Sequence, residues 1–178
     1  DLKEKTFWQI ISEYGKKSVI CYPILSWPIK KFNGYLISGS LTPSGEGTKN
    51  VYPLELKKEI ENIFGKVPTA DIPLFRNLSK EEIINEVTKL TEKQIEVEKF
   101  LLKSKEWDLF FTLIGLSDRM NHAFWRYTDK KHRKYKEGNK YENVLKDYYK
   151  LVDKKLGEML ELLDEDTKIV VLSDHGIT

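Results

Sequence analysis

The sequence predicts an α/β fold with a mostly parallel central sheet and helices on both faces. Two short and almost wholly apolar segments, residues 108–114 and residues 168–172, have the length and composition of buried central strands. Amphipathic patterns of helical length separate these two segments. Because parallel neighbours in a sheet need a crossover connection, this alternation indicates parallel strands with helices packed on either side.

The first part of the chain is expected to supply one helix and two strands. Residues 6–15 have helical spacing and end at Gly15, a residue that suits the end of a helix. Residues 18–22 form a continuous apolar run that ends before Pro23, as in a buried strand. Residues 34–38 have the pattern of a second short strand. A loop rich in Gly, Ser and Pro follows.

Two further helices are predicted in the middle of the chain. Pro53 suits the first turn of a helix that runs to Gly65. Ser79 and Glu82 have the spacing of a capping box, in which each side chain bonds the other residue's backbone N–H. The helix that starts there is expected to reach about Lys103.

The second half of the chain is expected to hold two helices before the last strand. Residues 118–127 and residues 141–163 both have helical patterns. We find no internal repeat, and the length suits one domain over residues 1–178. Residues 39–104 are a possible helical cap inserted into that domain.

The composition argues against several classes of partner. Hydrophobic residues make up 40% and charged residues 33% of the chain, and the formal net charge is +2. The charges are interspersed, so we expect no nucleic-acid partner. One basic cluster, residues 130–134, lies in a polar connection, and we interpret it as solvated surface. His132 belongs to this cluster and is interpreted in the same way.

The apolar runs fall short of the ~18 residues that a membrane span requires, so no membrane association is expected. Cys21 is the only cysteine, which rules out an intrachain disulfide and suggests a reducing, cytoplasmic location. The abundance of Lys, Glu and Ile suggests a thermophilic source. The oligomeric state remains open.

Two pairs of polar residues follow the two apolar strands. Asp118 and His122 are four residues apart, which brings them to one face of a helix. The alternative is that Asp118 caps the helix and His122 is packed or lies on the surface. Asp174 and His175 follow residues 168–172, and a turn at Gly176 would let both side chains face one ion. The alternative there is an ordinary turn with an exposed histidine.

The two pairs together favour a metal site. In open α/β sheets, ligand-binding residues gather beyond the carboxyl ends of the strands, and each pair is expected at such a place. Asp and His suit Zn²⁺ best, with Mn²⁺ also possible. We therefore expect two divalent ions held by Asp118, His122, Asp174 and His175.

The same residues carry a family resemblance that extends over nearly the whole chain. The strand that begins at residues 108–111 and the stretch from Ser117 to Tyr127 resemble the second metal motif of type I phosphodiesterase/nucleotide pyrophosphatase-like proteins, in the alkaline phosphatase superfamily. Residues 173–176, Ser-Asp-His-Gly, resemble their strand-end motif. Residues 33–44 look like the corresponding region of prokaryotic members.

The resemblance implies an alkaline phosphatase-like three-layer sandwich and metal-dependent hydrolysis of a phosphodiester or nucleotide pyrophosphate bond. Asp118 and His122 would hold one ion, and Asp174 and His175 the other. The family places its nucleophile and a further aspartate before this region and another histidine after it. We therefore expect a fragment truncated at both ends, without its nucleophile and inactive alone.

Two alternatives remain open at this point. The chain could be a non-catalytic module that retains relic ligands, or part of a phosphomutase or sulfatase of the same superfamily. Thr42, Ser44 and Thr48 could be nominated as nucleophiles, but the family pattern does not put one there. The substrate is expected to be a small phosphoester or nucleotide.

Overall fold

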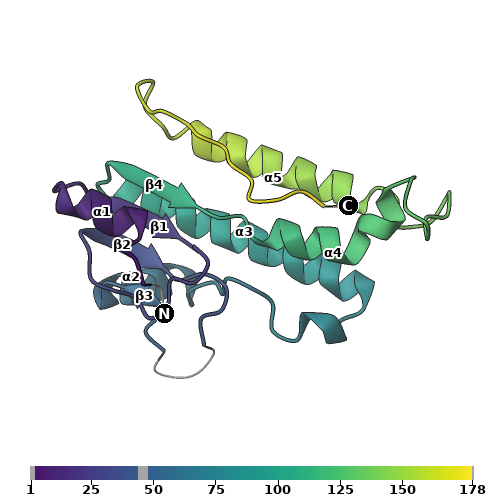
Figure 1. Ribbon diagram of the computed structural model, residues 1–178, viewed down its shortest axis with the longest axis horizontal. Helices are drawn as coiled ribbons and strands as arrows, with labels where there is room; N and C mark the ends of the chain where they lie inside the picture. The colour runs from purple at the N-terminus through teal and green to yellow at the C-terminus, as the bar shows by residue number, and fades with distance from the viewer. Residues whose placement is uncertain (1–2, 44–47, 178) are drawn as a thin grey trace. The chain divides into compact units, whose positions relative to one another are not determined.

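The computed structural model (Figure 1) describes residues 3–43 and 48–177. These residues form two units. Unit 1 comprises the described residues up to Pro73 together with Lys93–Gly115. Unit 2 comprises Leu74–Glu92 and the described residues from Leu116 onwards. No helix among the described residues is long and apolar enough to cross a membrane.

Unit 1 is built on a four-stranded sheet with the order β3-β2-β1-β4. Strand β1 (Ser18–Cys21) pairs in parallel with β2 (Gly34–Ile37) and with β4 (Leu109–Thr112). Strand β3 (Val51–Tyr52) is antiparallel to β2. The predicted mostly parallel sheet is confirmed, with one short antiparallel strand that the sequence patterns did not indicate. Strand β4 lies at the edge of the sheet that the described residues form. The prediction that it is a central strand is therefore wrong for these residues.

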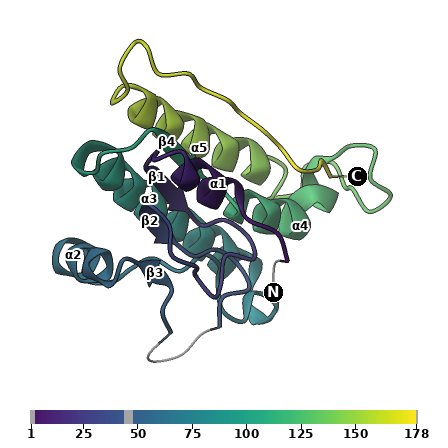
Figure 2. The same cartoon turned by 60° about the vertical axis from the view of Figure 1, so that its left-hand side comes forward.

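Helices cover both faces of this sheet (Figure 2). Successive side chains of a strand point to opposite faces, so the buried strand β1 has apolar side chains to cover on each face. On one face, Val19 and Cys21 of β1 share a core with apolar residues of α2 (Leu54–Phe64) and α3 (Lys80–Ser104). On the other face, Ile20 packs in a second core with Trp8 of α1 (Phe7–Glu13). Unit 1 is therefore the three-layer arrangement that the sequence predicted.

The helix signals read from the sequence are found where they were expected. The side chain of Glu82 accepts a hydrogen bond from Ser79 N at 2.8 Å, and Glu82 N donates to Ser79 Oγ at 3.2 Å, which completes the predicted capping box of α3. Pro53 immediately precedes α2. Gly65 ends it with a φ of 79°, a conformation that costs glycine little.

Unit 2 contains α4 (Leu116–Thr128), α5 (Val144–Leu160) and the first part of α3. A short 3-10 helix, η1 (Phe75–Asn77), precedes them. Helices α4 and α5 pack together and bury apolar side chains, among them Met120, Phe124, Leu145, Tyr148 and Val152. Within this core the hydroxyls of Thr91 and Tyr148 are hydrogen-bonded at 3.0 Å.

Residues 168–172 do not form the strand that their composition predicted. They belong to no helix or strand, and Val171 is 87% exposed. A strand exists only where a neighbouring segment completes its hydrogen-bond ladder, and no described segment pairs with these residues. A run of apolar residues indicates a tendency to be buried, but it carries no information about the partner.

Candidate functional site

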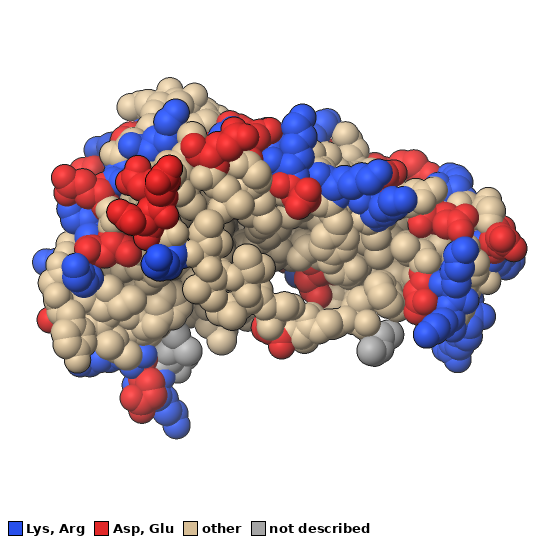
Figure 3. Space-filling model, turned by 90° about the horizontal axis from the view of Figure 1, so that it is seen from above, with Lys and Arg blue, Asp and Glu red and all other residues tan. Residues whose placement is uncertain are grey.

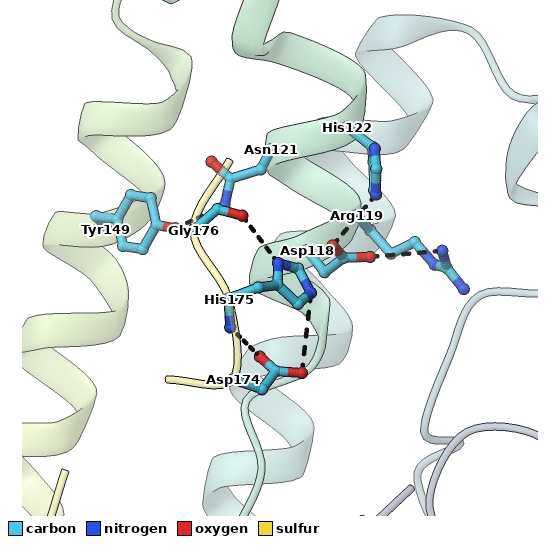
Figure 4. Close-up of polar contacts among 8 residues, drawn as sticks. All are labelled: Asp118, Arg119, Asn121, His122, Tyr149, Asp174, His175 and Gly176. Carbon is cyan, nitrogen blue, oxygen red and sulfur yellow. Dashed lines mark hydrogen bonds and ion pairs between the residues drawn. The ribbon is translucent and has the colours of Figure 1, made fainter. Parts of the chain in front are cut away.

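The first predicted pair lies in the first turns of α4. Asp118 and His122 stand one helical turn apart, and the distance from Asp118 Oδ1 to His122 Nε2 is 3.3 Å (Figure 4). The other carboxylate oxygen of Asp118 lies 3.7 Å from Arg119 Nη1. Helical spacing alone therefore brings this carboxylate and imidazole together, as the sequence predicted.

The second predicted pair lies in a turn after residues 168–172. The backbone N–H of His175 donates to Asp174 Oδ1 at 3.0 Å, and Ser173 Oγ donates to the carbonyl of His175 at 2.8 Å. These bonds hold the backbone in a turn. In an extended backbone, the side chains of two neighbouring residues would point to opposite faces. Asp174 Oδ2 and His175 Nε2 consequently lie 3.8 Å apart.

The ring of His175 is oriented by the backbone. Its Nδ1 lies 2.9 Å from the carbonyl oxygen of Gly176, and because a carbonyl only accepts, Nδ1 carries the proton. In the neutral ring the lone pair is then on Nε2, the nitrogen that faces Asp174. Histidines that bind a metal through one ring nitrogen commonly donate the N–H of the other ring nitrogen to a carbonyl in this way.

The two pairs also act on each other electrostatically. The hydrogen bond to Gly176, followed by the charges of Asp174 and Asp118, raises the pKa of His175. Asp118 belongs to the other pair, and Figure 4 shows the His175 ring beside it. The charge of Asp118 in the first pair therefore acts on His175 in the second.

The geometry fits a partial metal site. Two ligand atoms on a tetrahedral zinc ion are roughly 3.3 Å apart, the spacing found between Asp118 and His122. The Asp174–His175 spacing is wider. Within residues 3–43 and 48–177, however, no three His, Cys, Asp or Glu side chains stand together so that they could hold one ion. Each pair therefore offers two ligands, and a complete coordination shell needs others.

The sequence did not point to a polar contact beside the first pair. Asn121 Nδ2 donates to the hydroxyl of Tyr149 at 2.7 Å, which links α4 to α5 next to the candidate ligands (Figure 4). The two residues are 28 positions apart. No local spacing rule could have paired them.

The hydroxyls nominated in the polar loop fall elsewhere. Thr42 belongs to unit 1, where its Oγ1 donates to the carbonyl of Gly39 at 2.7 Å. Thr48 also belongs to unit 1, and Ser44 lies outside the described residues. The candidate ligands all belong to unit 2.

Comparison with known proteins supports the resemblance seen in the motifs. Neither the curated proteins nor the solved structures gave a significant match. The family model described as "Type I phosphodiesterase / nucleotide pyrophosphatase" matches residues 2–178, almost the whole chain. The chain therefore belongs to the type I phosphodiesterase/nucleotide pyrophosphatase family, within the alkaline phosphatase superfamily.

Proposed function

We propose that this chain carries part of the metal centre of a hydrolase that cleaves phosphodiester or nucleotide pyrophosphate bonds. Family membership supports phosphoester hydrolysis. The observation that carries the assignment to particular residues is the presence of two Asp–His pairs in unit 2. The charge of Asp118 in the first pair acts on His175 in the second.

Each pair has a defined role in this proposal. Asp118 and His122 would hold one divalent ion, and Asp174 and His175 a second, with Zn²⁺ favoured by the ligand types and Mn²⁺ the next choice. Such ions, when bound, stabilise the charge on the attacking and leaving oxygens of an in-line displacement. The carbonyl of Gly176 would keep His175 Nε2 available as a ligand.

The attacking group is proposed to lie outside these residues. Ser173 is the hydroxyl next to the second pair, and its proton is engaged by the carbonyl of His175. A hydroxyl nucleophile needs a base or metal to activate it, whereas this one stabilises a turn. We therefore infer that further ligands and the nucleophile are needed for turnover.

A direct test is the titration of the whole chain with metal. Isothermal titration calorimetry with Zn²⁺ and with Mn²⁺ should detect weak, saturable binding. Asp118→Asn or His175→Ala should lower the affinity at least tenfold. Glu55→Gln is the matched control, because Glu55 is an exposed carboxylate of α2 in unit 1, whereas both pairs belong to unit 2. Equal losses in the control and the test variants would overturn the assignment.

The same titration addresses the second candidate function, a non-catalytic module with relic ligands. The absence of any three-ligand group among the described residues favours this alternative. It predicts no saturable binding of either ion and no effect of the variants.

A further inference from the structure

A basic pocket lies beside the first Asp–His pair. It encloses about 300 Å³, and all of its lining belongs to unit 2. Its lining residues come from α4, from the segment between α4 and α5, and from the end of the described chain: Asn121, His122, Trp125, Arg126, His132, Arg133, Lys134 and Ile177. The pocket thus shares His122 with the candidate metal pair.

The charge of this lining has one sign. Two arginines and one lysine contribute positive charge, and no carboxylate belongs to the lining. Figure 3 shows Lys and Arg side chains gathered on the right, where the segment between α4 and α5 lies, with acidic side chains nearby. A concave surface lined by cations concentrates anions.

The lining also includes neutral side chains that carry an N–H. The Nε1–H of Trp125 is buried and has no hydrogen-bond partner among the described residues, so a ligand reaches it only if the ring moves. His132 Nδ1 accepts the backbone N–H of Lys134 at 3.1 Å, so the proton of the neutral ring is on Nε2 and can be donated. A phosphate oxygen is an acceptor that such groups can satisfy.

The segment that carries the basic residues is held in place by its own hydrogen bonds. The side chain of Asp129 accepts the N–H of Lys131 at 2.9 Å, and its carbonyl accepts the N–H of His132 at 3.0 Å. Asn139 Nδ2 donates to the carbonyl of Tyr127 at 2.9 Å and ties the segment to the end of α4. The pocket is therefore formed before a ligand arrives.

The guanidinium of Arg126 is also held. It stacks over the ring of Tyr127 at 4.6 Å from the centroid and donates to the hydroxyl of the same residue. Arginine presents several N–H groups in one plane, which suits bidentate contact with phosphate oxygens. A held guanidinium loses less side-chain freedom when it binds.

We propose that this pocket binds a second phosphate group of the substrate, the one next to the phosphorus under attack. This inference rests on the proposed function, because His122 places the pocket beside the candidate metal pair. Substrates of the pyrophosphate type carry such a group, whereas a phosphodiester of two neutral alcohols does not. Pyrophosphate bonds are therefore the preferred substrates of the site.

The test uses the whole chain with EDTA present, so that binding to the pocket is measured without any metal. Inorganic pyrophosphate and inorganic phosphate are titrated separately by calorimetry. Pyrophosphate should bind saturably and at least fivefold more tightly than phosphate. Arg133→Gln combined with Lys134→Gln should weaken pyrophosphate binding at least tenfold. Both side chains are exposed, so the variant should fold normally.

The matched control is Lys150→Gln combined with Lys154→Gln, which removes two exposed positive charges from α5. It should change pyrophosphate binding less than twofold. An equal loss in both double variants would mean that net charge alone attracts the anion, and absence of saturable binding would also overturn the proposal. Failure of metal binding leaves these results unchanged, so the two proposals can fail separately.

Discussion

The hydroxyl of Thr112 at the end of β4 donates a 2.6 Å hydrogen bond to Oε1 of Glu98 on α3. Glu98 is 1% exposed, and its second oxygen has no partner among the described residues. Burial raises the pKa of Glu98 to about 7, against the smaller opposing effect of the Thr112 bond. The core of unit 1 therefore contains a carboxyl group that is costly to ionise.

This carboxyl group predicts that stability falls as pH rises. The folded protein holds the Glu98 proton up to about pH 7, whereas the unfolded chain releases it near its ordinary value of 4.5. Between these values the folded state binds more protons, so the free energy of unfolding decreases with pH and levels off above 7. The loss is on the order of 3 kcal/mol.

Glu98→Gln should remove this dependence, because glutamine keeps the shape of the side chain and cannot ionise. At pH 8 the variant should be about 1–3 kcal/mol more stable than the parent chain, and at pH 5 nearly equal to it. Urea unfolding at the two pH values measures both differences. The same difference at pH 5 and pH 8 would contradict the assignment.

Thr112→Val should act in the opposite direction. The substitution removes the hydrogen bond that Thr112 donates to the Glu98 carboxylate, and bonds to charged groups contribute about 1.5–3 kcal/mol. The destabilisation should therefore be larger at pH 8 than at pH 5. Thr112→Ser is the control, because it retains the hydroxyl, and its pH dependence should match that of the parent chain.

Divalent metal should stabilise unit 2 through the two Asp–His pairs. An ion that binds only the folded chain adds about 2.7 kcal/mol at a hundredfold excess over its Kd. Millimolar Zn²⁺ or Mn²⁺ should raise the melting temperature by a few degrees, and His122→Ala or His175→Ala should reduce that rise by at least half.

The metal-free melting temperature of the two variants should hardly change. Both histidine side chains are more than 60% exposed, so little packing is lost when they are truncated. If either substitution destabilises the metal-free protein by several kcal/mol, the histidine is structural and the ligand role is wrong.

The 178-residue chain should not turn over phosphodiesters alone. Nucleophile and metal ligands act as a unit, so a chain with only two ligands for each ion should retain little of the rate enhancement. Hydrolysis of bis-p-nitrophenyl phosphate, followed with added Zn²⁺ or Mn²⁺, should stay within tenfold of the protein-free rate. A turnover number of about 1 s⁻¹ or more would contradict the prediction. Thr42→Ala would then test whether that hydroxyl is responsible.

Elements that carry local signals were predictable from the sequence. The capping box at Ser79 located the start of α3, and Pro53 and Gly65 located the two ends of α2. These signals depend only on residues that are close in sequence. Strand β3 has two residues, too few for any periodicity. Sheet order also lies beyond local patterns, so the end position of β4 was not predicted.

The candidate site divides in the same way. Asp118 and His122 meet through helical spacing, which a sequence displays directly. The pocket depends on the segment between α4 and α5, which the hydrogen bonds of Asp129 and Asn139 hold in place. From the sequence alone, the basic residues of this segment were interpreted as solvated surface. Their approach to His122 is a tertiary effect that no spacing rule encodes.

Residues 168–172 offer the sharpest contrast between sequence and structure. Ile169, Val170, Val171 and Leu172 are between 57% and 87% exposed, although their composition is that of a buried strand. Val171→Lys should therefore change the free energy of unfolding by less than about 0.5 kcal/mol, as exposed substitutions do. In a buried strand the same charge would cost several kcal/mol.

The substitution should also reduce association between chains. Exposed β-branched runs without charge are prone to pair with one another, and a lysine disfavours that pairing. Sedimentation velocity over a range of concentrations should show less self-association for Val171→Lys than for the parent chain, with Lys168→Gln, a change at an already polar position, as the control. A large loss of stability together with unchanged association would mean that these side chains are buried in solution, as their composition predicted.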